Sequence, residues 1–157
     1  MYSLLLMADP NLAAIKQYIP DAQVLLAYIV QSGQSDQSGQ NDNKKLVGIA
    51  VLTTVNSTTQ ELKNIAIAEQ YQGKGYAKVL IKAAKQQAQT LGAKELTVGT
   101  GNSRLSQLAL YHKCGFRLSH IIKDFFKSYP QPIIENGIEC IDMVMLSCKI
   151  DDKGSNQ

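Results

Sequence analysis

A glycine-rich turn that precedes an amphipathic stretch is the feature of this sequence with the clearest chemical potential. It reads Gln-Gly-Lys-Gly-Tyr-Ala, from Gln72 to Ala77. A helix that begins at Lys74 or Gly75 directs its free N–H groups and the positive end of its dipole at the turn, which favours a bound phosphate. Glycines let a phosphate approach the backbone closely. The turn therefore predicts a phosphate-binding loop.

Residue spacing excludes two common phosphate-binding motifs. A P-loop requires Gly-x4-Gly-Lys-Ser/Thr, which the sequence lacks. A dinucleotide fingerprint requires a third glycine, but Lys78 stands at that position after Gly73 and Gly75, and the turn at 99–101 fails in the same way. The pattern that remains is Gln-x-x-Gly-x-Ala.

This pattern resembles the acetyl-CoA motif of the GNAT superfamily of N-acetyltransferases. In the family the motif follows a strand and precedes an amphipathic helix, as it does here between Asn-Ile-Ala-Ile at 64–67 and the stretch 76–91. A second block lies about 30 residues downstream, where Asn102 is followed by Leu-Ala-Leu-Tyr-His-Lys-Cys-Gly-Phe at 108–116. The family alanine four residues before the tyrosine is replaced by Gln107.

The resemblance implies direct transfer of an acetyl group from acetyl-CoA, the co-substrate, to an amine, without a covalent enzyme intermediate. The segment 133–144 resembles a bacterial subgroup of uncharacterised members and identifies no acceptor. A backbone N–H of the strand before the turn is the usual family donor to the developing thioester oxyanion. The resemblance implies these cofactor-binding residues: Ile65, Ala66, Ile67, Gln72, Gly73, Lys74, Gly75, Tyr76, Ala77, Asn102 and Tyr111.

Tyr111 matches the family tyrosine that donates a proton to the departing thiolate. A hydroxyl hydrogen bond to the nascent thiolate lowers the barrier even when the proton is transferred late. The alternative is a structural tyrosine that packs on its own helix and uses its hydroxyl for a local hydrogen bond.

Glu61 is the candidate base that takes a proton from the acceptor amine. It aligns with a glutamate of the protein-lysine members of the family, four residues before Ile-Ala-Ile. A carboxylate suits general-base chemistry, whereas the alternative is an ordinary glutamate that faces water at the strand entry. Other relatives carry the base at the position of Thr97, which cannot serve. The proton therefore leaves through Glu61 or through ordered water.

Several polar residues allow more than one interpretation. Asn102 contacts the pantetheine arm of the cofactor, fixes the splayed end of the strand before it, or caps a helix. Lys74 and Lys78 either neutralise phosphate or are solvated. The histidines and cysteines lack the spacing of metal ligands, so we expect no metal site. Unpaired cysteines are typical of a reducing cytoplasm, the predicted location. The histidines and cysteines of the chain are His112, His120, Cys114, Cys140 and Cys148.

Composition limits the classes of protein to which the chain can belong. Its 157 residues, 45% of them hydrophobic, suit one domain over 1–150, with a mobile polar loop at 31–44 and a frayed tail at 151–157. The net charge of +3, without a dense basic stripe, argues against a nucleic-acid partner. No apolar stretch approaches the roughly 20 residues of a membrane span, and the run 2–7 is too short for a secretory signal.

The hydrophobic pattern predicts the elements that must position these residues. Strands followed by strand–helix–strand–helix–strand predict an α/β (α+β) fold, with a mixed, mostly antiparallel twisted sheet, a central parallel strand–helix–strand unit and helices on both faces. Helices are expected at 9–18, 76–91 and 105–112. Strands are expected at 2–7, 24–30, 46–55, 61–68, 96–98, 116–122 and 138–150.

The acceptor is left open by the sequence. A small-molecule amine, the favoured alternative, would bind in an acidic pocket, whereas a protein N-terminus or lysine would need an open groove. A non-catalytic CoA-binding module on the same scaffold is a further alternative, which the matching Tyr111 argues against. A homodimer is also left open. The acidic residues that could form an acidic pocket for a small-molecule amine are Asp124, Glu135, Glu139 and Asp142.

Overall fold

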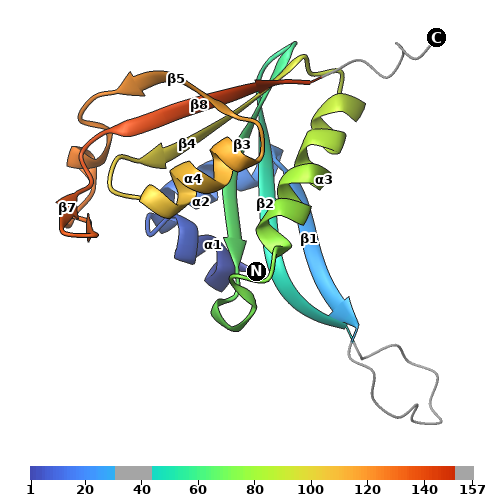
Figure 1. Ribbon diagram of the computed structural model, residues 1–157, viewed down its shortest axis with the longest axis horizontal. Helices are drawn as coiled ribbons and strands as arrows, with labels where there is room; N and C mark the ends of the chain where they lie inside the picture. The colour runs from blue at the N-terminus through green and yellow to red at the C-terminus, as the bar shows by residue number, and fades with distance from the viewer. Residues whose placement is uncertain (31–43, 151–157) are drawn as a thin grey trace.

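A computed structural model of the chain describes residues 1–30 and 44–150. Within them, one six-stranded sheet is antiparallel throughout except for the parallel pair β3 and β4 (Figure 1). The predicted mixed sheet with its central parallel unit is confirmed. In spatial order the strands are β1 (Gln23–Val30), β2 (Lys44–Asn56), β3 (Thr59–Ile67), β4 (Glu95–Gly101), β8 (Met143–Lys149) and β5 (Arg117–Ile122).

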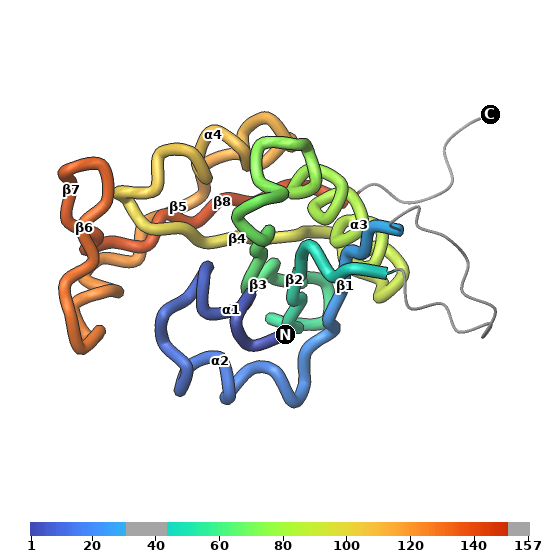
Figure 2. Tube along the Cα trace, turned by 90° about the horizontal axis from the view of Figure 1, so that it is seen from below, coloured from blue at the N-terminus to red at the C-terminus, as the bar shows by residue number. Residues whose placement is uncertain are grey.

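Helices cover both faces of the sheet, as predicted (Figure 2). On one face lie α1 (Tyr2–Ala8) and α2 (Leu12–Tyr18), and on the other lie α3 (Tyr76–Thr90) and α4 (Leu105–Lys113). The antiparallel pairing of β1 with β2 confirms that the stretch 31–44 joins two neighbouring strands. Apart from Lys44, which begins β2, that stretch and the tail 151–157 lie outside the described residues.

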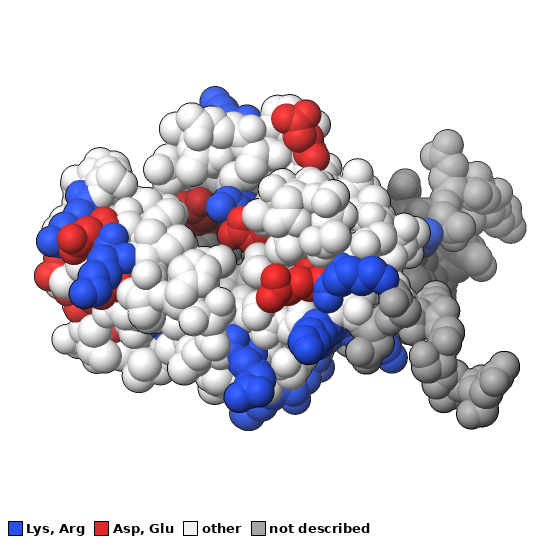
Figure 3. All heavy atoms as spheres, turned by 90° about the horizontal axis from the view of Figure 1, so that it is seen from above, with Lys and Arg blue, Asp and Glu red and all other residues white. Residues whose placement is uncertain are grey.

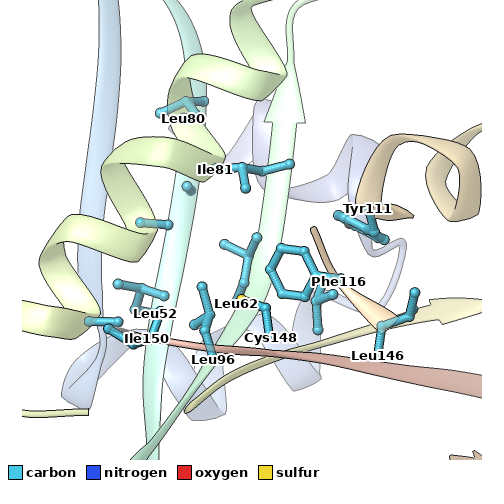
Figure 4. Packing of buried hydrophobic residues seen from close by; sticks show 14 of the residues in the cluster. Leu52, Leu62, Leu80, Ile81, Leu96, Tyr111, Phe116, Leu146, Cys148 and Ile150 are labelled. Carbon is cyan, nitrogen blue, oxygen red and sulfur yellow. The ribbon is translucent and has the colours of Figure 1, made fainter. Parts of the chain in front are cut away.

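Each face of the sheet has its own apolar core. The larger core packs α3 and α4 on the sheet, and its fully buried members include Leu52, Ile81 and Phe116 (Figure 4). The smaller core buries Leu5 of α1 and Ile15 of α2 against the other face. Burying these side chains removes apolar surface from water, which is the main force that holds the layers together.

The prediction of a strand at 2–7 is wrong, because these residues form the helix α1. The run contains no β-branched residue, and leucine and methionine are good helix formers. Leu4 and Leu5 point into the smaller core, while Leu6 and Met7 are exposed, so the short apolar run is amphipathic only when it is helical.

The start of the following helix also differs from the prediction. We expected Asp9-Pro10 to begin it, but the N-cap is Asn11, whose side-chain Oδ1 accepts a hydrogen bond from the N–H of Ala14 (3.1 Å). Asp9 instead accepts the N–H of Asn11 at 2.9 Å. The helix ends at Tyr18, as predicted, and Pro20 lies in a short 3-10 helix, Ile19–Asp21. Asp9 is thereby left in the connection between α1 and α2.

The predicted strand at 138–150 is divided in two. Its first residues form β7 (Ile138–Glu139), which pairs with β6 (Ile134–Glu135) across a turn at Asn136 and Gly137, both with positive φ. The N–H groups of residues 141 and 142 donate to the side chain of Asn102 and not to a strand. These two residues therefore interrupt the predicted strand between β7 and β8. The remaining short helices are Glu69–Tyr71 and Phe125–Ser128.

Candidate active site

The parallel strands β3 and β4 diverge part-way along their length (Figure 1). Their pairing runs from Thr59 opposite Glu95 to Leu62 opposite Val98 and then stops, although β3 continues to Ile67 and β4 to Gly101. Beyond that point no strand pairs with the facing edges of β3 and β4 in the part of the chain that the structure describes. The separation exposes backbone N–H and C=O groups that a ligand can use.

A β-bulge at Lys63 marks the start of the divergence. On β2, the neighbours Val51 and Leu52 pair with Asn64 and Leu62, so Lys63 is an extra residue in β3. Leu62 belongs to the core under α3, whereas Ala66 belongs to the core under α1. In a regular strand two residues that are four apart lie on the same face. Because the bulge adds one residue between them, Leu62 and Ala66 lie on opposite faces of the sheet. The bulge directly follows Leu62, the last residue of β3 that pairs with β4.

A cavity of about 570 Å³ fills the space between the two strands. Its wall comes from β3, β4, α4, the glycine loop and the end of α1. Figure 3 shows a hollow near the centre of one face of the molecule, with acidic and basic side chains inside it. Of the predicted cofactor-binding residues, those that line the cavity are Ile65, Ala66, Ile67, Gln72, Gly73, Gly75, Tyr76, Ala77 and Tyr111.

The glycine loop has the backbone geometry that an anion site needs. Gly73 and Gly75 have φ of 71° and 87°, values that favour glycine, and Gly75 is the N-cap of α3. The first hydrogen bond of the helix runs from the N–H of Val79 to the carbonyl of Gly75. The N–H groups of residues 76–78 therefore have no partner within the helix. Gln72 Nε2 donates to the Ile67 carbonyl at 2.9 Å, which ties the loop to the end of β3.

The two lysines of the glycine loop have different surroundings. Lys78 lines the cavity, on the first turn of α3. Lys74 is exposed, and its Nζ lies 5.4 Å from the ring centre of Tyr71, a cation–π distance. Lys74 is absent from the cavity wall, so only Lys78 is positioned beside the space that a ligand would fill.

Tyr111 reaches the same cavity from α4 and is 4% exposed. Its ring packs edge-on against Phe116, with 5.8 Å between ring centres. No side chain or backbone group of the described residues forms a hydrogen bond with its hydroxyl. Burial, opposed by the nearby charge of Arg104, raises the pKa of Tyr111 to about 12. At neutral pH the hydroxyl is therefore a proton donor with no protein partner.

We expect this raised pKa to be visible in a titration. The folded chain keeps a proton that the unfolded chain loses at its ordinary pKa of 10.0, so this tyrosine destabilises the fold as pH rises from 10.0 towards about 12. The difference in ultraviolet absorbance between the wild type and Tyr111→Phe should report one phenol that ionises near pH 12. A phenol ionising near pH 10.0 would show that Tyr111 is not buried as described.

Glu61 lies beside the cavity and not in its wall. Its carboxylate pairs with Lys63 Nζ at 3.3 Å, and Lys63 itself lines the cavity. Glu61 stands between Thr53 of β2 and Thr97 of β4, at the paired end of the strands. The carboxylate of Glu61 therefore neighbours the cavity through its ion pair with Lys63 and does not line the cavity itself.

The comparisons with known proteins agree with this geometry. The model of the acetyltransferase (GNAT) family matches residues 26–116, more than half of the chain. The chain belongs to the GNAT family of acetyltransferases. Members of the family are acyltransferases that use acetyl-CoA as co-substrate. The matched region contains the diverging strands, the glycine loop and Tyr111.

Several relatives are similar over nearly the whole chain. An uncharacterised N-acetyltransferase of Bacillus subtilis, YvbK, is 40% identical over 93% of this chain and 86% of its own. A GNAT acetyltransferase of Elizabethkingia anophelis, solved with acetyl-CoA bound, is 42% identical over 94% and 89%, with a TM-score of 0.83. The IAA acetyltransferase of Bacillus cereus is 43% identical over 94% and 91%, with a TM-score of 0.81.

Asn102, which matches the GNAT asparagine, has its side chain engaged outside the cavity wall. Its Oδ1 accepts the N–H groups of Ile141 (2.8 Å) and Asp142 (2.9 Å), and its Nδ2 donates to the Glu139 carbonyl (3.0 Å). In this structure the amide fixes the connection between β7 and β8. These hydrogen bonds favour a structural interpretation of Asn102 over a contact with the cofactor.

Several residues of the cavity wall were not predicted from the sequence of this GNAT chain, and Asp9, Asn64 and Arg104 are among them. Asp9 follows α1, Asn64 lies within β3 directly before Ile65, and Arg104 precedes α4. Arg104 donates from Nε to Glu135 Oε2 at 3.1 Å and from a terminal nitrogen to the Ala8 carbonyl at 2.6 Å. No local motif surrounds Asp9 or Arg104, and Asn64 begins the run Asn-Ile-Ala-Ile without having been predicted to line the site. The sequence would have indicated their place beside the cavity only if residues 2–8 had been predicted as a helix that ends there.

The remaining expectations concern metals, membranes and cysteines. Among residues 1–30 and 44–150, no three His, Cys, Asp or Glu side chains form a group that could hold a metal ion. None of the helices described there combines the length and apolar character needed to cross a bilayer. Cys114, Cys140 and Cys148 are free thiols.

Proposed function

We propose that this GNAT enzyme binds acetyl-CoA between β3 and β4 and transfers its acetyl group to the primary amine of a small molecule. The observation that supports the proposal most is the meeting of three parts in one cavity. These are a glycine loop at a helix N-terminus, the unpaired edge of β3 and the unpartnered hydroxyl of Tyr111. The acetyl-CoA bound to the 42% identical Elizabethkingia anophelis relative supports the choice of cofactor.

Each part has a separate task in binding acetyl-CoA. The backbone N–H groups of 73–78 and the dipole of α3 receive the pyrophosphate, and Lys78 adds a positive charge. The pantetheine arm lies along β3 at 64–67, where the missing strand leaves hydrogen-bonding groups for its amides. A backbone N–H of Ile65, Ala66 or Ile67 donates to the thioester oxygen as negative charge develops on it.

The reaction requires two protons to leave the nitrogen and one to reach the sulfur. The ammonium group of the acceptor loses a proton through water to Glu61, and the free amine attacks the thioester carbon. The C–N bond forms, the C–S bond breaks, and the thiolate takes the proton of the Tyr111 hydroxyl. The amide nitrogen releases its second proton, which restores Tyr111. The products are an N-acetyl amine, CoA and one proton.

Two further parts of the proposal rest on broader features. Residues 1–150 act as one domain, an arrangement that the shared sheet under both cores supports. The free thiols of Cys114, Cys140 and Cys148 support a reducing compartment, the cytoplasm.

A binding and turnover assay tests the proposed function. Acetyl-CoA and CoA should raise the melting temperature and ATP should not, because stabilisation follows affinity for the folded state. With a panel of small primary amines, release of free thiol should be matched by the N-acetyl product in a mass spectrum. Binding without turnover of any amine would favour a non-catalytic CoA-binding module instead.

A further inference from the structure

The proposed binding of the cofactor does not use the part of the cavity wall that the end of α1 provides. Met7, Ala8 and Asp9 line this part, together with Arg104 from the start of α4. The connection between α1 and α2 places Asp9 in the wall, although Asp9 belongs to no motif in the sequence.

Asp9 is held in position by one of its two oxygens. Its Oδ1 accepts the N–H of Asn11 at 2.9 Å and the hydroxyl of Tyr129 at 3.2 Å. Tyr129 in turn packs on Phe125 and Phe126, with ring centres 6.4 Å and 5.2 Å away. No group of the described residues forms a hydrogen bond with Oδ2. The carboxylate is therefore oriented by the protein and keeps an oxygen for a ligand.

The negative charge of Asp9 is not neutralised by an ion pair in the described part of the chain. Two cationic side chains of the cavity wall have other partners: Lys63 pairs with Glu61 at 3.3 Å, and Arg104 pairs with Glu135 at 3.1 Å. The third cation of the wall, Lys78, belongs to the glycine loop. Burial and the charge of Asp9 raise the pKa of Tyr129, whose hydroxyl thus stays a donor to the carboxylate.

Asn64, another residue of the wall, has a buried side-chain oxygen that also lacks a donor. Asn64 is 4% exposed, and its Nδ2 donates to the Leu5 carbonyl and the Tyr18 hydroxyl, both at 3.1 Å. Since the Leu5 carbonyl can only accept, the amide must present its nitrogen there, and its Oδ1 is buried without a partner. Buried acceptors without a donor are rare and call for a ligand or a water molecule.

We infer that Asp9 recognises the acceptor as an ammonium ion, which makes cationic primary amines the substrate class of this enzyme. The inference rests on the proposed function, because it concerns the second substrate of the same cavity. A free carboxylate oxygen matches the charge and the N–H groups of an ammonium ion. Asp9 binds and orients the acceptor before its proton leaves, so it is a specificity residue and adds no step to the reaction.

The substitution Asp9→Asn tests this inference with little change in structure. Asparagine keeps an Oδ1 that can accept from Asn11 and Tyr129, and only the charge is lost. Asp21→Asn is the matched control, because Asp21 is exposed and lies outside the cavity wall. The probes are phenethylamine, which is a cation at pH 7, and aniline, a primary amine that is neutral there.

We expect the KM for phenethylamine to rise at least about tenfold in Asp9→Asn, since a hydrogen bond to a charged group is typically worth that much. The KM for aniline, the affinity for acetyl-CoA and the melting temperature should stay close to those of the wild type and of Asp21→Asn. Tyr129→Phe, which removes one support of the carboxylate, should raise the KM for phenethylamine by a smaller factor.

Three results separate failure of the inference from failure of the proposed function. An unchanged KM for phenethylamine in Asp9→Asn, or equal increases for both amines, overturns the role of Asp9 and leaves the proposed function intact. Turnover of aniline without turnover of phenethylamine by the wild type also overturns it. A wild-type enzyme that binds acetyl-CoA and acetylates neither amine contradicts both the cationic substrate class and the proposed small-amine acceptor.

Discussion

Replacing Tyr111 by phenylalanine should lower kcat at least about tenfold, because general acid catalysis typically contributes a factor of about 10²–10⁴ and water can replace part of it. The substitution removes the hydroxyl and keeps the ring that packs on Phe116. Because that hydroxyl has no partner among the described residues, its loss breaks no hydrogen bond of the fold. The affinity for acetyl-CoA should therefore change little.

Parallel measurements of kcat, cofactor affinity and melting temperature check this expectation. Tyr28→Phe is a suitable control, since Tyr28 is 51% exposed on β1 and lies outside the cavity wall. A structural tyrosine would give the opposite pattern in Tyr111→Phe, with a lower melting temperature and normal turnover in the folded fraction. Wild-type turnover in a fully folded variant would remove Tyr111 from the mechanism.

Replacing Gly75 by valine should lower the affinity for acetyl-CoA at least about tenfold, the effect of losing one charge-assisted hydrogen bond. A Cβ at this position would meet nothing within 4 Å, so the variant has no steric clash in the free protein. Its φ of 87° is unfavourable for valine, and a shift of the backbone would turn the N–H groups of α3 away from the pyrophosphate.

Gly92→Val provides the matched control at the other end of α3. Gly92 has a φ of 80° and equally open surroundings, so both variants should lose about 1–2 kcal/mol of unfolding free energy from the same backbone strain. Only Gly75→Val should bind acetyl-CoA more weakly in calorimetry. Equal affinities in the two variants would show that the glycine loop does not hold the pyrophosphate.

Local sequence patterns were sufficient to predict the glycine loop and the strand and helix on either side of it, where we propose that the cofactor binds. The glycine loop, α3 and the end of β3 are continuous in the chain, and Gly92 ends α3 in the left-handed conformation that its position predicts. Within α3, Ile81 and Ala88 are buried, while Leu91 after its last turn is 42% exposed.

The acceptor half of the site could not be predicted, because it is assembled by contacts between distant parts of the chain. Arg104 reaches the Ala8 carbonyl across 96 residues, and Tyr129 reaches Asp9 across 120. The run 2–7 is too short and uniformly apolar for its period to separate a strand from a helix. With α1 taken as a strand, Asp9 had no predicted position beside the cavity. The bulge at Lys63 has no sequence signature either.

A crystal structure of this chain with acetyl-CoA would test the central claim most directly. We expect the pyrophosphate to lie within hydrogen-bond distance of the backbone N–H groups of 73–78, on the glycine loop and the first turn of α3. The pantetheine arm should follow β3 at 64–67, with the thioester sulfur beside the Tyr111 hydroxyl. Acetyl-CoA bound with its pyrophosphate away from the glycine loop, or its sulfur out of reach of Tyr111, would contradict the proposed site.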